Sequence, residues 1–185
     1  QDMQLVLHLS FCYSLGMANV GWLLFYYQVP ASPSTHRAYV WRKLKALGAL
    51  YLQNSICILP AKEEFSSRLK ELKDELIARG GEASLLGIEL VEKAEDESIV
   101  ERFVLQSGDE YGEFLEQCRD FHAELAKERG KHHLTFGELE ENEVELAKLR
   151  SWLPRIIARD FFVIPIRAKA LAALAACERD LSLFE

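Results

Sequence analysis

The pattern of apolar and polar positions opens with a strand-like run that leads directly into a helix start. Residues 20–29 are continuously apolar and aromatic up to Pro30, which predicts a buried central strand. Ser32 can cap the next helix with Pro33 at its first position, because a cap oxygen accepts a free backbone N–H and Pro lacks that donor. Gly48 can adopt the left-handed conformation of a helix end, so the helix is expected to stop there.

Short strands and a second helix follow. Apolar runs at 49–52 and 55–59 flank a predicted two-residue turn at 53–54. The segment 62–79 has apolar residues at intervals of four, three and four, the spacing of a buried helical stripe: Phe65, Leu69, Leu72 and Leu76. A last strand is predicted at 83–91. This β-α-β-β-α-β order is that of the ferredoxin-like arrangement, in which both helices cover one face of an antiparallel sheet.

Beyond residue 93 the chain becomes helical and strongly charged. Helices are expected at Ser98–Leu105, Glu110–Glu128, Phe136–Ala158 and Ala168–Leu183. Pro154 and Pro165 are predicted to mark breaks or kinks, because Pro lacks the N–H of the helical hydrogen bond. The sequence therefore predicts an α+β protein, with a ferredoxin-like domain over 20–93 and a C-terminal helical region over 94–185 packed on it.

The first residues are expected to lie outside this core. The segment 1–19 is apolar, but it lacks the basic start of a signal peptide, contains His8, and is too polar for a bilayer span. Met17 resembles an initiator just before the first strand, so residues 1–16 are interpreted as a misplaced start or vector sequence. A cleaved targeting segment is the alternative interpretation.

Composition and charge indicate the cellular compartment of the chain and the part of it that suits an anion. A chain of 185 residues, 49% of them hydrophobic, can bury a core without a disulfide or metal. The four cysteines are far apart and form no Cys-x-x-Cys pair, so a reducing cytoplasm is expected. No membrane partner and no cofactor are expected either. The net charge is -7, yet residues 1–62 carry five Lys and Arg residues against the single acid Asp2. The front of the chain is therefore the part that suits an anion.

The first helix contains the candidate anion site. On a helical wheel Arg37 falls between Leu44 and Trp41, so its guanidinium is expected to start from the inward-facing side of the first turn. Free N–H groups at the helix start favour anions, and three hydroxyls lie beside them, those of Ser32, Ser34 and Thr35. One hypothesis is that Arg37 with these hydroxyls binds a tetrahedral oxyanion or a phosphate of nucleic acid. The alternative is an internal ion pair with a carboxylate such as Glu82 or Asp160.

A small basic strip follows on the same helix. Arg42 and Lys45 share the outer face with Lys43 nearby, which suggests contact with DNA phosphates. The alternative is a solvated helix face, because specific DNA-binding proteins usually carry larger basic surfaces. Dimerisation would double the strip.

Motifs of catalysis and metal binding are missing. The sequence has no Gly-x-Gly-x-x-Gly, no phosphate-binding Gly-Lys-Ser/Thr loop, no Gly-x-Ser-x-Gly elbow and no His-Glu-x-x-His. His132 and His133 lie on a predicted loop, but a metal site needs further ligands that the sequence does not place. Asp160, an acid among aromatics, is interpreted as a buried partner of Arg37, Arg155 or Arg159. No enzymatic activity and no metal site are therefore expected.

Several segments resemble the N-terminal domain of the ChrB chromate-resistance proteins. The similarity is carried by Trp22-Leu23-Leu24, Val29-Pro30-Ala31-Ser32-Pro33-Ser34, Arg37, Val40-Trp41-Arg42-Lys43-Leu44-Lys45, Leu47-Gly48-Ala49, Ile58-Leu59-Pro60 and Gly80-Gly81-Glu82-Ala83. The helices of Tyr111 and Cys177 and the run Arg159-Asp160-Phe161 look like its continuation, so the resemblance spans about residues 20–184. A shorter form of the pattern is similar to the central domain of PaaX-type repressors.

The resemblance implies a part in chromate resistance, where ChrB proteins are regarded as chromate-responsive regulators of a neighbouring efflux transporter. It suggests a transcriptional regulator or sensor subunit, a homodimer that binds promoter DNA and chromate or a sulfate-like oxyanion. Longer members carry a C-terminal chromate-resistance domain, which a chain ending at Glu185 is expected to lack. A non-catalytic dimerisation or interaction module without DNA binding is the alternative, and an enzyme such as a reductase accessory domain is a third interpretation.

Overall fold

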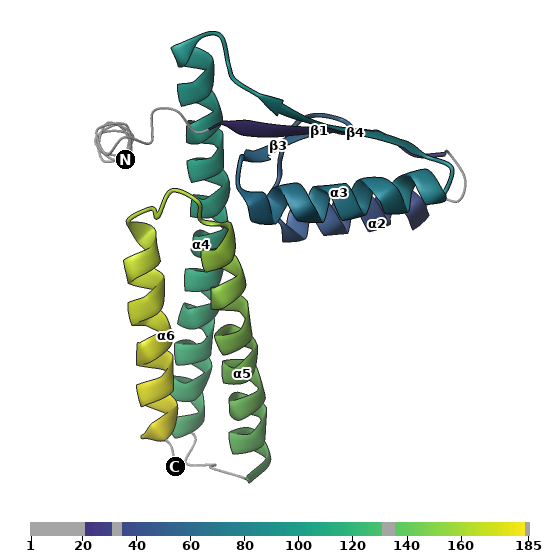
Figure 1. The fold of residues 1–185 in the computed structure, drawn as a ribbon. Helices are drawn as coiled ribbons and strands as arrows, with labels where there is room; N and C mark the ends of the chain where they lie inside the picture. Colours follow the sequence, from purple (N-terminus) through teal and green to yellow (C-terminus); the bar gives the residue numbers. More distant parts are fainter. Residues whose placement is uncertain (1–20, 31–34, 131–135, 184–185) are drawn as a thin grey trace. The chain divides into compact units, whose positions relative to one another are not determined.

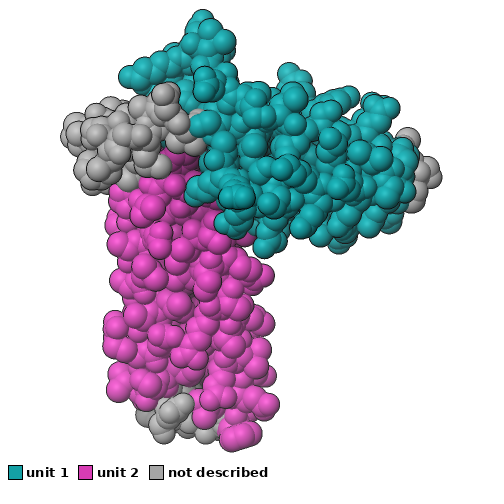
Figure 2. Space-filling model, viewed as in Figure 1, with its two compact units in different colours: residues 1–102 teal, residues 103–185 magenta. Residues whose placement is uncertain are grey.

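The computed structural model describes residues 21–30, 35–130 and 136–183 and divides into two compact units, residues 1–102 and 103–185 (Figure 2). The described part of the first unit contains β1 (Trp22–Gln28), α2 (Thr35–Ala46), β2 (Leu50–Gln53), β3 (Ile56–Pro60), α3 (Glu63–Ala78), β4 (Glu82–Ile88) and the first turns of α4 (Lys93–Gly130). The expected leader at 1–19 lies outside the described residues.

A four-stranded antiparallel sheet forms one layer of the first unit. The strand order is β2-β3-β1-β4, so β1 lies in the interior of the sheet, as its continuous apolar run predicts. In the register, Phe25 pairs with Cys57 of β3 on one side and with Leu85 of β4 on the other. Helices α2 and α3 lie on the same face of the sheet (Figure 1). The α+β class predicted from the sequence is confirmed.

The core of this unit lies between the sheet and the two helices. Phe25 and Tyr27 of β1 are 0% and 4% exposed, and Val40 and Leu44 of α2 are fully buried. The predicted stripe of α3 is confirmed, since its four apolar residues are all buried: Phe65, Leu69, Leu72 and Leu76. Each such side chain contributes about 1.5–3 kcal/mol when removed from water. The helix spacing therefore fixes which face of α3 meets the sheet.

The two predicted turns of the first unit are present, and one of them lies one residue later than predicted. Gly48 has a φ of 77°, the left-handed conformation expected after α2. The hairpin turn falls at 54–55, one residue later than predicted, and Ser55 has a φ of 66°. The pairing of β2 with β3 is irregular between Tyr51 and Gln53, and the extra residue there moves the turn along the chain.

Three helical segments make up the described part of the second unit: the remainder of α4, α5 (Phe136–Arg159) and α6 (Ile166–Ser182). They run side by side (Figure 1). The predicted break between helices at 98–105 and 110–128 was wrong, because α4 continues through Gly108 and Gly112. A glycine in a helix costs about 1 kcal/mol. Burial of Phe103, Tyr111 and Phe114 on the same helix offsets that cost.

Proline positions differ in their effect on the helices. Pro165 precedes α6, where a missing N–H leaves no helical bond unmade. At Pro154, where a break or a kink was expected, the helix does not break, and α5 runs through this residue as the predicted helix Phe136–Ala158 does. Leu149, Leu153 and Ile156 are buried on both sides of this proline, so packing holds the helix together where one backbone bond is lost. Within the described residues, no helix is both long and apolar enough to cross a membrane.

Candidate anion-binding hollow

An open hollow lies in the first unit where three elements meet. It has a volume of about 1260 Å³ and is formed by the end of β1, the first turns of α2 and the β2–β3 hairpin. Its lining residues are Tyr27, Gln28, Val29, Arg37, Ala38, Trp41, Tyr51, Gln53, Asn54 and Ser55. The hollow thus joins Arg37, which the sequence singled out, to hairpin residues that no local pattern connected with it.

The lining suits an anion. Arg37 supplies a permanent positive charge, and no carboxylate is present among the lining residues. Amide and hydroxyl groups add hydrogen-bond donors from Gln53, Asn54 and Ser55. Trp41 is 48% exposed, so an indole face is available beside the guanidinium.

Two tyrosine hydroxyls meet at the sheet end of the hollow. The Oη atoms of Tyr27 and Tyr51 are 3.1 Å apart, which makes a hydrogen bond in which one phenol donates to the other. Burial raises the pKa of Tyr51, and the hydrogen bond with Tyr27 raises it further. Tyr51 therefore stays protonated at neutral pH.

Arg37 is exposed and lines the hollow together with residues of β1 and of the β2–β3 hairpin. A helical wheel gives the direction of a side chain, but it does not tell whether another element of the fold covers that side. At the first turn of α2 the sheet side is the open hollow, so the guanidinium stays in water. No described carboxylate lies within ion-pair distance of it. Asp160 instead accepts hydrogen bonds from Tyr111 and from the backbone N–H of Ile164, both in its own unit.

The hydroxyls expected to help Arg37 are only partly described. Ser32 and Ser34 lie outside the described residues, as do His132 and His133. Thr35 is the first described residue of α2 and is exposed. Within the described ranges, no group of three or more His, Cys, Asp or Glu side chains is arranged to hold a metal ion.

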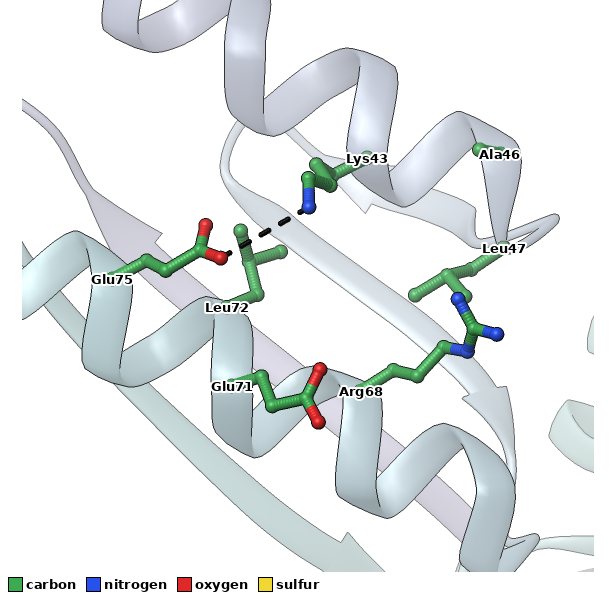
Figure 3. A pocket seen from close by; sticks show the side chains of 7 residues that line it. All are labelled: Lys43, Ala46, Leu47, Arg68, Glu71, Leu72 and Glu75. Carbon is green, nitrogen blue, oxygen red and sulfur yellow. Dashed lines mark ion pairs between the residues drawn. The ribbon is translucent and has the colours of Figure 1, made fainter.

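The three residues of the predicted basic strip divide between two environments. Arg42 is exposed, and the Lys45 ammonium lies 5.1 Å from the centre of the Trp41 ring. Lys43 instead faces α3, with its Nζ 4.0 Å from Glu75 Oε1 (Figure 3). Arg42 and Lys45 are therefore the two members of the strip without a described carboxylate partner.

A contact network between α2 and α3 was not predicted from the sequence. The Tyr39 hydroxyl donates to Glu75 Oε2 at 2.6 Å, and the Arg79 guanidinium lies 4.3 Å from the centre of the Tyr39 ring. A small pocket beside it is lined by side chains of both signs, among them Arg68 and Glu71 (Figure 3). Because Lys43 pairs with Glu75 and the pocket has a second carboxylate in Glu71, this site is less suited to an anion than the hollow around Arg37.

Asp160 was expected to pair with an arginine, but its side-chain partner in the second unit is a tyrosine. The Arg159 Nε donates to Glu110 Oε2 at 3.0 Å, so Arg159 pairs with Glu110 and not with Asp160. The Tyr111 hydroxyl donates to Asp160 at 3.1 Å. Burial raises the pKa of Tyr111, and the Asp160 carboxylate adds to this increase. The partners of Tyr111 and Glu110 lie 49 residues further along the chain, so the sequence gave no signal for either contact.

Comparison with known proteins assigns most of the chain to a family. Residues 37–185 match the family described as "Protein ChrB, N-terminal". A curated relative, Protein ChrB of Cupriavidus metallidurans, is 31% identical over 98 residues. That match covers 52% of this chain and 29% of the relative. The family match includes Arg37 and the whole of the second unit.

Proposed function

The chain belongs to the family of ChrB N-terminal regions, and from this premise we propose that it is a regulatory protein of chromate resistance that binds a tetrahedral oxyanion such as chromate or sulfate. It acts as a chromate-responsive transcriptional regulator or as the sensor subunit of one. It works by binding and not by catalysis, without a cofactor, in the cytoplasm.

The observation that supports this proposal most directly is the composition of the hollow. Its lining carries Arg37, several hydrogen-bond donors and no carboxylate. A divalent oxyanion is stabilised by the charge of a guanidinium and by hydrogen-bond donors that are not already bound to another protein group. The exposed position of Arg37 leaves it open to ligand from solution.

Calorimetry with chromate and with sulfate tests this site. Arg37→Gln is expected to lower oxyanion affinity at least tenfold, since the loss of one charged hydrogen bond costs about 1.5–3 kcal/mol. Arg42→Gln is the matched control, because it removes the same charge from the same helix but does not line the hollow. Equal affinity of a folded Arg37→Gln protein and the native chain would exclude the site.

DNA binding is the second part of the proposal and rests on Arg42 and Lys45. Both project from α2 without a described carboxylate partner, which leaves their charges available to phosphates. Retention of promoter DNA should weaken with added salt and with the double change Arg42→Gln, Lys45→Gln. Glu75→Gln is the control, since it frees Lys43 and does not remove a cation.

The alternative is a non-catalytic dimerisation or interaction module without DNA binding. An apolar part of the sheet supports it, since Leu24 pairs with Leu86 across β1 and β4 and Tyr26 follows on the same face. Tyr26 and Leu86 are 40% and 52% exposed. A homodimer that dissociates in Leu86→Lys, together with no DNA retention at low salt, would favour this alternative.

The sheet unit is further proposed to have the ferredoxin-like topology. Its element order β-α-β-β-α-β and its strand order β2-β3-β1-β4 support this assignment. In such folds sheets pair through edges or faces, which agrees with a homodimer as the functional form.

A further inference from the structure

Two buried cysteines lie against each other in the second unit, on α4 and α6. Cys118 and Cys177 are 2% and 0% exposed. The Cys177 Sγ lies 3.8 Å from the backbone oxygen of Cys118, so the two side chains are neighbours in the core of this unit. The two residues are 59 positions apart in the chain, so the fold and not the local sequence brings them together.

A histidine and a carboxylate extend this pair toward the surface. The Nε2 atom of His122 lies 3.5 Å from Cys177 Sγ, and its Nδ1 atom lies 2.7 Å from Asp180 Oδ2. An ionised carboxylate can only accept, so Nδ1 carries a proton and donates it to Asp180. In the neutral ring, Nε2 then keeps its lone pair and can accept the thiol proton of Cys177.

The two thiols are not equivalent. The neighbouring Cys177 thiol lowers the pKa of the Cys118 thiol. The neighbouring Cys118 thiol, together with burial, raises the pKa of Cys177. Because the thiolate is the nucleophile, Cys118 is the group that reacts first and Cys177 the one that needs a proton acceptor.

We propose that Cys118 and Cys177 form an oxidation site that a hydroperoxide converts to a disulfide, with His122 as the proton acceptor for Cys177. The Cys118 thiolate attacks one peroxide oxygen, the O–O bond breaks, and the leaving alkoxide or hydroxide takes up a proton. Cys118 is then a sulfenic acid. Cys177 gives its proton to His122 and attacks Cys118 Sγ, which forms the S–S bond and expels hydroxide that becomes water.

Burial limits the reagents that reach this pair. Both thiols are shielded, whereas the side chain of His122 is 31% exposed and lies 3.5 Å from Cys177 Sγ. The hydroperoxide is the electron acceptor: two thiols and one hydroperoxide give one disulfide, one alcohol or water, and one water. A disulfide needs the sulfur atoms at about 2.0 Å, so oxidation requires the two neighbouring side chains to turn toward each other.

Peptide mapping of the full chain tests the proposal without any substitution. The reduced protein is treated with hydrogen peroxide at neutral pH, denatured, alkylated and digested without reductant. A peptide that joins Cys118 to Cys177 is expected, with the loss of two thiols. If both thiols remain free, or if they are found only as sulfinic or sulfonic acids, the proposal is wrong.

Variants then assign the roles. Cys118→Ala and Cys177→Ala should each abolish the linked peptide, whereas Cys57→Ala should keep it, because Cys57 is buried in the other unit. His122→Gln should slow disulfide formation about tenfold, since the thiolate fraction of Cys177 falls when no base accepts its proton. Glu124→Gln, an exposed position on the same helix, is the matched control. An unchanged rate in a folded His122→Gln protein would overturn the role of His122.

Discussion

The hollow of the first unit and the Asp160 site of the second place their polar side chains in opposite environments. In the first unit Arg37, Arg42 and Trp41 are exposed, and the hollow beside them is open to solvent. In the second unit Asp160 is 5% exposed and Tyr111 is fully buried, and each has a polar partner. Exposed cations are free to bind an incoming anion. Buried pairs contribute to stability, because their groups have already exchanged water for protein partners.

This difference predicts how each unit responds to substitution. Removal of an exposed side chain in the first unit should change ligand binding more than stability. Removal of a buried side chain in the second unit leaves a cavity or an unpaired group, so stability should fall. Four measurements of the free energy of unfolding test this comparison.

The largest effect is expected from the aromatic core of the second unit. Phe103 is 1% exposed, and its ring centre lies 5.6 Å from that of Phe161. Phe103→Ala should lower the free energy of unfolding by about 3–5 kcal/mol, because the lost contacts leave a cavity. Urea titration measures this loss. Leu105→Ala, on the same helix but 51% exposed, is the control and should cost far less.

The next effect depends on pH and comes from a buried thiol in the first unit. Burial raises the pKa of Cys57 from 9.0 to about 12. The folded state therefore favours the protonated thiol, and this contribution is complete below pH 9 and is lost as the pH rises from 9 to 12. The free energy of unfolding should fall by about 1.4 kcal/mol per pH unit in that interval on account of Cys57.

Cys57→Val isolates this contribution. Other groups titrate in both proteins, including Tyr51 and Tyr111, whose pKa values are also raised. The difference between the native chain and the variant cancels the titration of Tyr111 and leaves, for Tyr51, only the smallest part of its pKa increase, which Cys57 itself causes. Urea titrations at pH 8.5 and pH 11 should show a smaller loss in the variant. The same loss in both proteins would contradict the burial of an ionisable thiol at this position.

The buried polar pair of the second unit should have a smaller effect. Asp160 accepts from the Tyr111 hydroxyl and from the backbone N–H of Ile164. Asp160→Asn weakens both bonds, so the free energy of unfolding should fall by about 2 kcal/mol. A double-mutant cycle with Tyr111→Phe measures their coupling. Strictly additive losses would mean that the two side chains do not interact.

Periodic patterns predicted most elements of the fold. Phe65 and Leu76 lie on a regular apolar stripe, so α3 and its buried face followed from spacing alone. The break expected near Gly108 failed for a physical reason. Helix propensity acts locally, whereas burial of Tyr111 and Phe114 stabilises α4 across the glycines.

The candidate site was less predictable, because it depends on contacts between distant segments. Arg37 was recognised from its place at a helix start, but its exposure depends on the hairpin residues that leave the hollow open. Lys43 looked like a surface cation, and only the position of α3 gives it Glu75 as a partner. The pair Cys118 and Cys177 gave no signal either, since 59 residues separate them.

The smallest effect on stability is expected at Trp41, where the comparison between the units is most direct. This ring is 48% exposed and carries the Lys45 ammonium at 5.1 Å. Trp41→Ala should lower the free energy of unfolding by less than about 1 kcal/mol, the size of an exposed cation–π contact. Leu44→Ala, one turn away and fully buried, should cost about 2–5 kcal/mol. If urea titration gave Trp41→Ala a loss as large as that of Leu44→Ala, the indole would be part of the core, and the first unit would not present an open aromatic and cationic surface.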